Sequence, residues 1–454
     1  MTAARVSVVA AALDDAGCGV GMADDGALVH VVDLLPGEAA DVAIDHASPH
    51  RAEAWARVVR RSGPASPDRV VPACPAFGRC GGCAWQHLGY PAQLAAKRER
   101  VARELGVPLA AVSEVRPSPA TVGYRNKGKY VVGTAGGQLV LGAYAPRSHR
   151  VVDTLGCRVV APIIDEVASW IRGAAERAQL IAYDERARTG ELRYAIVREV
   201  GGDVMVTLVV ASGVPRNKLE RVANALARHA AVRGVIAIVN DRRDGAIVPS
   251  GSSAQVLLGQ GHLALEIAGV TVEVGASEFL QVNHAQAEAM YARVAELALQ
   301  AAPASPHVVE LYAGLGGIGL HLATRGARVT AVEIDREAVA QLRRAAERAQ
   351  LPITAIAADA ASAPGAFRAE LVAAGSIDVV IVDPPRKGLG HGGVTLVAEL
   401  AAPTVIYVSC EPASLARDLA ALADHGYVAH AIEPFDLMPG TAQVETVVSL
   451  RRQR

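Results

Sequence analysis

Cys410 lies at the point where a predicted strand gives way to a predicted helix. The β-branched run at 405–408 predicts a short buried strand, and Pro412 in a first turn predicts a helix that continues through Leu419. Open α/β sheets bind ligands at this end of their strands, and a helix N-terminus lowers the pKa of a thiol, which favours the nucleophilic thiolate. The alternative is a buried core cysteine, because free cysteine is among the most buried residue types.

The glycine run at 314–319, GLGGIG, follows a predicted buried strand and leads into a predicted helix. Nicotinamide, flavin and methyl-donor enzymes share its G-x-G-x-x-G spacing, so the run does not choose between their cofactors. Glu333 ends the next predicted strand, where a carboxylate can accept hydrogen bonds from both ribose hydroxyls of an adenosine ligand. Asp359 and Asp383 end the third and fourth strands. Each acid alone could be an ordinary helix cap, but together with Cys410 these strand ends predict a cofactor along one sheet edge.

The turn Asp383-Pro384-Pro385 narrows the chemistry. Dehydrogenases do not need it, whereas S-adenosylmethionine-dependent enzymes that methylate nucleobases commonly have such a rigid turn beside the target base. Addition of a thiolate to C6 of uracil turns C5 into an enolate carbon that can accept a methyl group, which gives Cys410 a role in covalent catalysis. The C5 proton must then be removed by a general base, and Glu445, which enters the last predicted strand, is the candidate.

Three cysteines form a C-x5-C-x2-C array, and one further thiol before the catalytic region could complete a set of four. The set is Cys74, Cys80, Cys83 and Cys157. Four thiolates suit a 4Fe-4S cluster or structural zinc, and the spacing differs from the paired C-x2-C of zinc ribbons, which favours the cluster. Disulfides fit poorly, because Cys18 and Cys410 would be left over and nothing indicates secretion.

Positive charge is concentrated locally, although the net charge of the chain is only −1. Residues 93–150 carry ten Lys and Arg against three Glu, whereas residues 1–62 carry five Arg against nine acidic residues. The basic residues at 97–103 could be a solvated helix face. Arg125, Lys127 and Lys129 lie between Tyr124 and Tyr130, and basic side chains combined with aromatics suit a phosphate backbone and an unstacked base, so we expect them to bind RNA.

Three domains must position these groups. Short apolar runs separated by turns predict a small OB-type β-barrel over residues 1–62, which could bind RNA or brace a neighbouring domain. Residues 63–280 begin with a Pro-, Gly- and Ser-rich linker and predict a mixed α+β domain, with strands near 130–133, 191–200, 203–210 and 234–240 and a helix at 214–230. Residues 281–454 alternate strands and helices, as in a doubly wound Rossmann-like α/β domain.

No apolar run approaches the roughly 20 residues that a membrane-spanning helix needs. The eight-residue run VSVVAAAL near the start resembles a signal-peptide core, but it runs into Asp14 and Asp15 without a convincing cleavage site. We therefore expect a cytoplasmic monomer with no membrane partner.

In their order along the chain, the motifs resemble those of the bacterial RNA uracil-C5 methyltransferases. They are Gln281-Val282-Asn283, the glycine run, Asp383-Pro384-Pro385-Arg386, Ser409-Cys410-Glu411-Pro412, Leu415-Ala416-Arg417-Asp418 and Glu445. The cysteine array and the leading barrel look like the members with a TRAM domain and an iron-sulfur cluster, which modify 23S ribosomal RNA. The resemblance covers nearly the whole chain.

The resemblance implies a role for each site residue. Cys410 would be the nucleophile and Glu445 the base, and the four cysteines of the array would hold a 4Fe-4S cluster. The implied S-adenosylmethionine contacts are Gln281, Tyr312, Gly314, Gly317, Glu333, Asp359 and Asp383. The alternatives are the same chemistry on a tRNA uridine, a metal-stabilised RNA-binding protein without methyltransferase activity, and a methyltransferase for a small molecule or protein.

Three positions depart from the family pattern. Glu411 stands where Asn or Asp is usual, and its longer carboxylate could raise the pKa of the neighbouring thiol. Gly440 stands where His is frequent, and Asp359 stands where Asn is frequent. None of these departures removes a group that the reaction requires.

Overall fold

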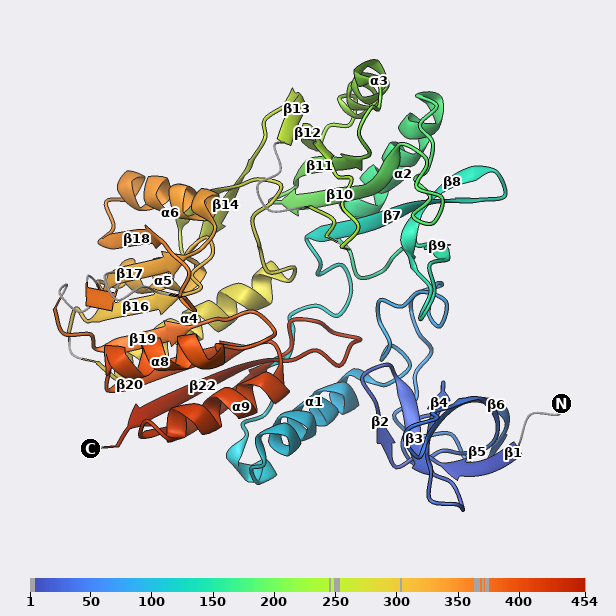
Figure 1. The fold of residues 1–454 in the computed structure, drawn as a ribbon, viewed down its shortest axis with the longest axis horizontal. Coiled ribbons are helices and arrows are strands. Elements are labelled where there is room, and N and C mark those ends of the chain that lie inside the picture. The colour runs from blue at the N-terminus through green and yellow to red at the C-terminus, as the bar shows by residue number, and fades with distance from the viewer. Residues whose placement is uncertain are drawn as a thin grey trace.

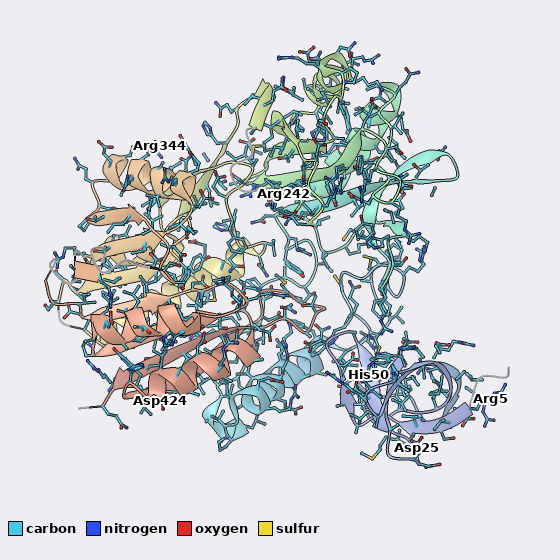
Figure 2. All side chains as sticks on the ribbon, in the orientation of Figure 1. Arg5, Asp25, His50, Arg242, Arg344 and Asp424 are labelled. Atoms are coloured by element: carbon cyan, nitrogen blue, oxygen red, sulfur yellow. The ribbon has the colours of Figure 1, made fainter. Side chains whose placement is uncertain are left out.

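The computed structural model describes residues 5–244, 246–248, 254–302, 304–362, 368–369, 371 and 375–453. Figure 1 shows an N-terminal sheet, a central α/β region and a larger C-terminal α/β region. In Figure 2, Arg344 on α6 and Asp424 just after α9 lie at opposite ends of the C-terminal region, and Arg5, Asp25 and His50 lie on the N-terminal sheet. None of the helices in these described residues is long and apolar enough to cross a membrane.

Six strands form the N-terminal sheet in the order β1-β5-β6-β4-β3-β2, and Figure 1 shows it curled into a barrel-like shape. They are β1 (Arg5–Val9), β2 (Ala12–Leu13), β3 (Cys18–Met22), β4 (Leu28–Val32), β5 (Ala39–Ala47) and β6 (Glu53–Ser62). Val29, Val31 and Val42 belong to its buried core, and because successive side chains of a strand face opposite sides, Leu28 and Val32 of β4 are exposed. The short strands predicted over residues 1–62 are confirmed.

Helix α1 (Tyr90–Leu105) connects the barrel region to the C-terminal region and packs against α9. A short 3-10 helix, η1 (Leu109–Ala111), follows it. The interpretation of residues 97–103 as a solvated helix face is wrong for Lys97 and Arg100, which are buried. Lys97 Nζ donates to Asp436 Oδ1 at 2.6 Å, and both side chains are fully inaccessible to solvent. The helix is therefore anchored by a buried ion pair to a residue near the end of the chain.

The central sheet has seven strands in the order β13-β12-β11-β10-β7-β8-β9. They are β7 (Lys127–Ala135), β8 (Gln138–Tyr144), β9 (Val151–Asp153), β10 (Leu192–Val200), β11 (Asp203–Val210), β12 (Val232–Val239) and β13 (Ala254–Gly259). Helices α2 (Pro162–Arg177) and α3 (Arg216–Leu226) bury their apolar stripes against this sheet. The four predicted strands and the predicted helix are confirmed, whereas α2 was not predicted.

The C-terminal sheet has the order β18-β17-β16-β19-β20-β22-β21, in which β22 runs antiparallel to both of its neighbours. Its strands are β16 (His307–Leu311), β17 (Arg328–Glu333), β18 (Ile353–Ala357), β19 (Val379–Val382), β20 (Thr404–Ser409), β21 (Tyr427–Phe435) and β22 (Glu445–Arg452). A separate hairpin, β14 (Leu263–Ile267) and β15 (Val270–Val274), packs against α5 and α6.

Helices cover both faces of the C-terminal sheet. Alternate strand residues pack on α4 (His284–Gln300), α5 (Gly317–Ala323) and α6 (Arg336–Arg348) on one side. The other side packs on α8 (Gly390–Leu400), α9 (Pro412–Ala423) and α1. This is the predicted doubly wound α/β arrangement, and it brings the carboxyl ends of the parallel strands to one edge.

Candidate active site

Cys410 lies between the end of β20 and the start of α9, as predicted. The turn around it is held by the peptide N–H of Glu411, which donates to Ser409 Oγ at 3.2 Å. Burial raises the pKa of the Cys410 thiol to about 12, and the carboxyls of Glu445 and Asp383 act in the same direction. The predicted lowering of this pKa by the helix is therefore wrong for the free protein, because burial and nearby acids outweigh the helix N-terminus.

Two of the predicted acids, Asp383 and Glu445, lie close enough to each other and to Cys410 for their charges to interact. Burial raises the pKa of Asp383 to about 7, and burial together with Asp383 raises that of Glu445 to about 8. Glu445 Oε2 is buried and has no hydrogen-bond partner among the described residues. The structure thus brings the proposed nucleophile and the proposed base into one buried acidic site.

Glu310 on β16 is a third acid of this site, which the sequence reasoning missed. Burial and Asp383 raise its pKa to about 8, and the peptide N–H groups of Ile318 and Gly319 at the start of α5 oppose the rise. The available signal was its position four residues before the first glycine of the run, inside a strand that is otherwise largely apolar.

The loop after β19 holds Arg386 beside the acids. Its positive charge opposes the raised pKa values of both Cys410 and Glu445. Asp418 on α9 anchors this loop, because its Oδ2 accepts from the peptide N–H of Leu389 at 2.6 Å and from Tyr407 Oη at 2.7 Å. The Leu-Ala-Arg-Asp motif therefore fixes the Asp-Pro-Pro-Arg turn next to the thiol.

The glycine loop has the tight geometry expected of a cofactor cradle. Gly314 and Gly316 have φ values of 55° and 80°, a region that favours glycine. A Cβ on Gly317 would lie 2.6 Å from the ring of Tyr291, so only glycine fits there. Glu333 at the end of β17 accepts from the peptide N–H of Gly314 at 2.8 Å. The loop and the predicted ribose-binding acid are thus one connected unit.

The other predicted cofactor residues border this unit. Asp359 caps its own turn, because it accepts from the peptide N–H of Ala361 at 2.9 Å and from Ser362 Oγ at 2.8 Å. Tyr312 has a positive φ of 62° and lies near Asp359, whose charge helps burial to raise the tyrosine pKa to about 12. Gln281 is buried, and its backbone carbonyl accepts from Asn126 Nδ2 at 3.0 Å.

Glu411, the unusual neighbour of Cys410, is paired with Arg100 on α1. Arg100 Nη2 lies 3.2 Å from Glu411 Oε1 and 3.0 Å from Asp15 Oδ2, and its Nη1 donates to the carbonyl of Ala442 at 3.0 Å. One buried arginine therefore connects the barrel, the residue after the nucleophile and the loop that leads into Glu445. The acids that raise the thiol pKa are Glu445 and Asp383, not the longer carboxylate at 411 as expected.

The four cysteines of the array line one cavity of about 250 Å³. Cys74, Cys80, Cys83 and Cys157 are all free thiols, and burial raises the pKa of Cys83 to about 11. Within the described ranges, no three His, Cys, Asp or Glu side chains are grouped so that they could hold a metal ion. The structure confirms that the cysteines share a site but does not show the predicted cluster.

The predicted RNA-binding residues Arg125, Lys127 and Lys129 line the same cavity. Lys129 is exposed, whereas Arg125 and Lys127 are half-buried. Burial and the charges of Arg198 and Lys129 lower the pKa of Lys127 to about 7. The sequence reasoning missed Arg198, which faces Lys127 across β7 and β10.

Two aromatic residues near the cysteines, Trp85 and Tyr124, also contact the loop before Glu445. The peptide N–H of Trp85 donates to the carbonyl of Gly440 at 2.8 Å, and Tyr124 Oη donates to the carbonyl of Pro439 at 3.1 Å. A Cβ on Gly440 would lie 3.2 Å from Gln86 Cγ. The absence of a side chain at Gly440, where the family often has His, therefore allows this loop to pack closely on Gln86.

Comparisons with known proteins agree with this geometry. The sequence profile of the tRNA (Uracil-5-)-methyltransferase family matches residues 260–453. An uncharacterised RNA methyltransferase of Halalkalibacterium halodurans is 34% identical over 85% of this chain and 84% of its own length. One from Thermosynechococcus vestitus is 33% identical over 96% of both chains.

A solved structure shares the whole fold. The Pyrococcus abyssi tRNA (uracil-54, C5)-methyltransferase, crystallised with S-adenosyl-L-homocysteine, is 24% identical and has a TM-score of 0.77, with 98% of this chain and 99% of that chain covered. The profile, the sequence relatives and the site geometry lead to one assignment: the chain belongs to the RNA uracil-C5 methyltransferase family.

Proposed function

We propose that the protein methylates C5 of a uridine in RNA through a covalent bond between Cys410 and C6 of the base. As a member of its family, the protein uses S-adenosylmethionine as methyl donor. The single observation that carries the proposal is the shared buried site of Cys410, Glu445 and Asp383, in which each carboxyl influences the thiol. Neither a binding module nor a structural protein needs a thiol and two protonatable carboxyls at the edge of a cofactor fold.

The proposed reaction begins when the Cys410 thiolate adds to C6 of the uracil, which places negative charge on C5 and O4. C5 then accepts the methyl group, and the donor leaves as a neutral thioether. Glu445 removes the C5 proton, the C5–C6 double bond re-forms, and the Cys410 thiolate leaves C6. The target uridine must leave its stack to expose C6, so a single-stranded loop is the preferred substrate.

We propose that S-adenosylmethionine binds along the edge formed by the glycine loop and the adjoining strand ends. Its contacts would be Gln281, Tyr312, Gly314, Gly317, Glu333, Asp359 and Asp383. The sulfonium group is a cation, and an opposite charge nearby favours the ionised forms of Cys410, Glu445 and Asp383. Cofactor binding would thus convert the protonated site of the free protein into a reactive one.

We further propose that Cys74, Cys80, Cys83 and Cys157 hold a 4Fe-4S cluster. Four thiols around one cavity support this proposal, because four Cys thiolates are the usual ligands of a 4Fe-4S cluster. Anaerobically purified protein should contain about four iron and four sulfide per chain. A colourless protein with one zinc would contradict this assignment.

We propose 23S ribosomal RNA as the substrate in preference to tRNA, since the cysteine array resembles the ribosomal members of the family; the barrel does not separate the two, because the Pyrococcus abyssi tRNA enzyme covers 98% of this chain. Residues 1–62 would form the TRAM domain, 63–280 the cluster and RNA-binding domain, and 281–454 the methyltransferase domain of a monomer. Among the three basic candidates, the exposed Lys129 is the best placed to contact an RNA phosphate, followed by Arg125 and Lys127.

The proposal is tested by mapping 5-methyluridine by mass spectrometry in ribosomal and transfer RNA from a strain that lacks the gene. Wild-type protein should restore the missing modification, and Cys410→Ala should restore neither the methyl group nor a covalent RNA adduct. Cys18→Ala is the matched control, because Cys18 is a buried thiol in the barrel. Methylation by Cys410→Ala would remove Cys410 from the reaction, and a modification missing from tRNA alone would overturn the ribosomal assignment.

A further inference from the structure

Four basic side chains gather at the cysteine cavity. Arg125, Lys127 and Lys129 line it, and Arg198 is paired opposite Lys127 in the sheet, close enough for its charge to lower the pKa values of both lysines. None of the four forms a salt bridge with another described residue. Glu278 is the acid whose charge acts on Lys127 and Arg198, so four cations are opposed by one carboxylate.

Arg198 is the most buried of these basic side chains. It is 2% exposed, its Nη2 donates to the carbonyl of Glu278 at 2.7 Å, and its Nη1 is buried without a hydrogen-bond partner in the described structure. Burial lowers its pKa to about 10. Arg125 shows the same deficit, because its Nε is also buried and has no such partner. Buried charges without a partner are expensive unless a ligand compensates them.

The strand pairing adds to the cost. Arg198 on β10 is directly opposite Lys127 on β7, and like charges at directly opposite positions destabilise an antiparallel pair. Asn126, which lies just before Lys127, connects this strand to residues 281–282: its backbone N–H donates to the carbonyl of Val282 at 2.8 Å and its Nδ2 to that of Gln281. A fixed group of positive charges is thus built into a rigid part of the molecule.

We propose that Arg125, Lys127 and Arg198 form a cationic wall that compensates the negative charge of the group bound by Cys74, Cys80, Cys83 and Cys157. This inference rests on the proposed cysteine-bound cluster. Thiolates, not thiols, bind metal, and a four-thiolate iron-sulfur centre keeps a net negative charge. An RNA phosphate is the competing anion, but the burial of Arg198 places it beyond the reach of a nucleic acid backbone, whereas the exposed Lys129 remains available for one.

The test compares Arg198→Gln, which removes the charge, with Arg198→Lys, which keeps it. Arg193→Gln is the matched control, because Arg193 is a buried arginine on the same strand but is paired with Glu185 at 2.8 Å. After anaerobic reconstitution of the full chain, iron, sulfide and the loss of visible absorbance under a chelator are measured, together with the midpoint potential. Thermal unfolding of the metal-free proteins shows whether each variant folds.

We expect Arg198→Gln to lose its iron at least several-fold faster than wild type and to have a more negative midpoint potential, because a missing positive charge disfavours reduction. A tenfold change in the reduced-to-oxidised ratio would be about 59 mV for one electron. Arg198→Lys and Arg193→Gln should behave as wild type. Should Arg198→Gln fail to fold, Lys127→Gln takes its place with the same expected direction.

Two results would overturn the proposal, and they are distinguishable. If wild type holds four iron and four sulfide and Arg198→Gln matches it in iron loss and potential, the wall has no role toward the cluster. If Arg198→Gln at the same time lowered the salt dependence of RNA binding, these basic side chains would bind RNA phosphate instead. If wild type itself holds no iron or sulfide, the cluster assignment fails first, whatever Arg198 does.

Discussion

The proposed methyl-transfer site and the cysteine cavity gather ionisable groups of opposite type, acids in the first and bases in the second. Around Cys410, the carboxyls of Asp383, Glu445 and Glu310 are buried together and have raised pKa values. Around the cysteines, basic side chains are gathered with little acidic compensation. Burial disfavours the charged form of these groups in both places, which raises the pKa of the acids and lowers that of the bases. From this difference we propose that each region is prepared for a ligand of the opposite charge: the sulfonium cation of the cofactor in one and an anionic cluster in the other.

The largest effect should come from removing the proton acceptor of the acidic region. Glu445→Gln should still transfer the methyl group but retain the C5 proton, so turnover should fall by about 10²–10⁴-fold. The expected product is a protein–RNA adduct that survives denaturing gel electrophoresis. Normal turnover without adduct would assign the base to another residue, and Glu310→Gln would then be the variant to examine.

The next prediction concerns the pH dependence of stability. Burial and Asp383 raise the pKa of Glu445 from 4.5 to about 8, so the folded state keeps a proton that the unfolded chain releases. This stabilisation is fully present below pH 4.5 and is lost as the pH rises toward 8. In urea unfolding of the ligand-free protein, Glu445→Gln should reduce the loss between these pH values by on the order of 2 kcal/mol.

Glu347→Gln provides the control for that measurement, since Glu347 is an exposed carboxyl on α6 and should leave the wild-type pH dependence unchanged. An identical pH dependence for Glu445→Gln and wild type would show that Glu445 is ionised in the free protein. Only Asp383 and Glu310 would then remain as protonated acids near Cys410.

A third experiment tests whether the acidic region responds to a cationic ligand. Alkylation of Cys410 in the free protein should be slow near pH 8, because the thiol pKa is raised to about 12. S-adenosylmethionine should speed alkylation by about tenfold relative to S-adenosylhomocysteine, which lacks the sulfonium charge, since each pKa unit is a factor of ten. The modification of Cys18, read by peptide mass spectrometry, should be equal with both ligands. Equal rates at Cys410 would contradict charge compensation by the cofactor.

The smallest effect should separate the exposed from the buried members of the basic region. Lys129→Gln should reduce the slope of log affinity for RNA against log salt concentration by about 0.7–0.9, the contribution of one phosphate contact. Arg233→Gln, on the exposed end of the same sheet and paired with Asp203, should leave the slope unchanged. An unaltered slope for Lys129→Gln would leave the RNA contacts to other surfaces.

The positions of the site residues could be predicted from sequence better than their chemical states. The placement of Cys410 between a strand and a helix followed from β-branched residues and Pro412, and the doubly wound fold followed from the alternation of elements. The pKa of the thiol was predicted in the wrong direction, because it depends on burial and on Glu445 and Asp383. Those carboxyls are distant in sequence, and no local pattern reports their distance from a thiol in space.

Ion pairs between residues distant in sequence could not be predicted either. Lys97 and Arg100 read as surface residues because their partners, Asp436 and Glu411, follow more than 300 residues later. Arg198 belongs to a predicted strand but to no recognised motif. Its position opposite Lys127 depends on the register of β7 and β10, which the sequence does not show. Helix and strand periodicity finds the elements, whereas charge partners depend on how the elements assemble.

The ion pair between Lys97 and Asp436 also bears on how the chain is made. Its partners are 339 residues apart in sequence. At a synthesis rate of about 5–20 residues per second, the ribosome takes roughly 17–70 s to add Asp436 after Lys97. During this time the barrel can fold, but α1 lacks both its charge partner and the sheet on which it packs. Helix α1 therefore keeps an unpaired Lys97 until Asp436 has been synthesised.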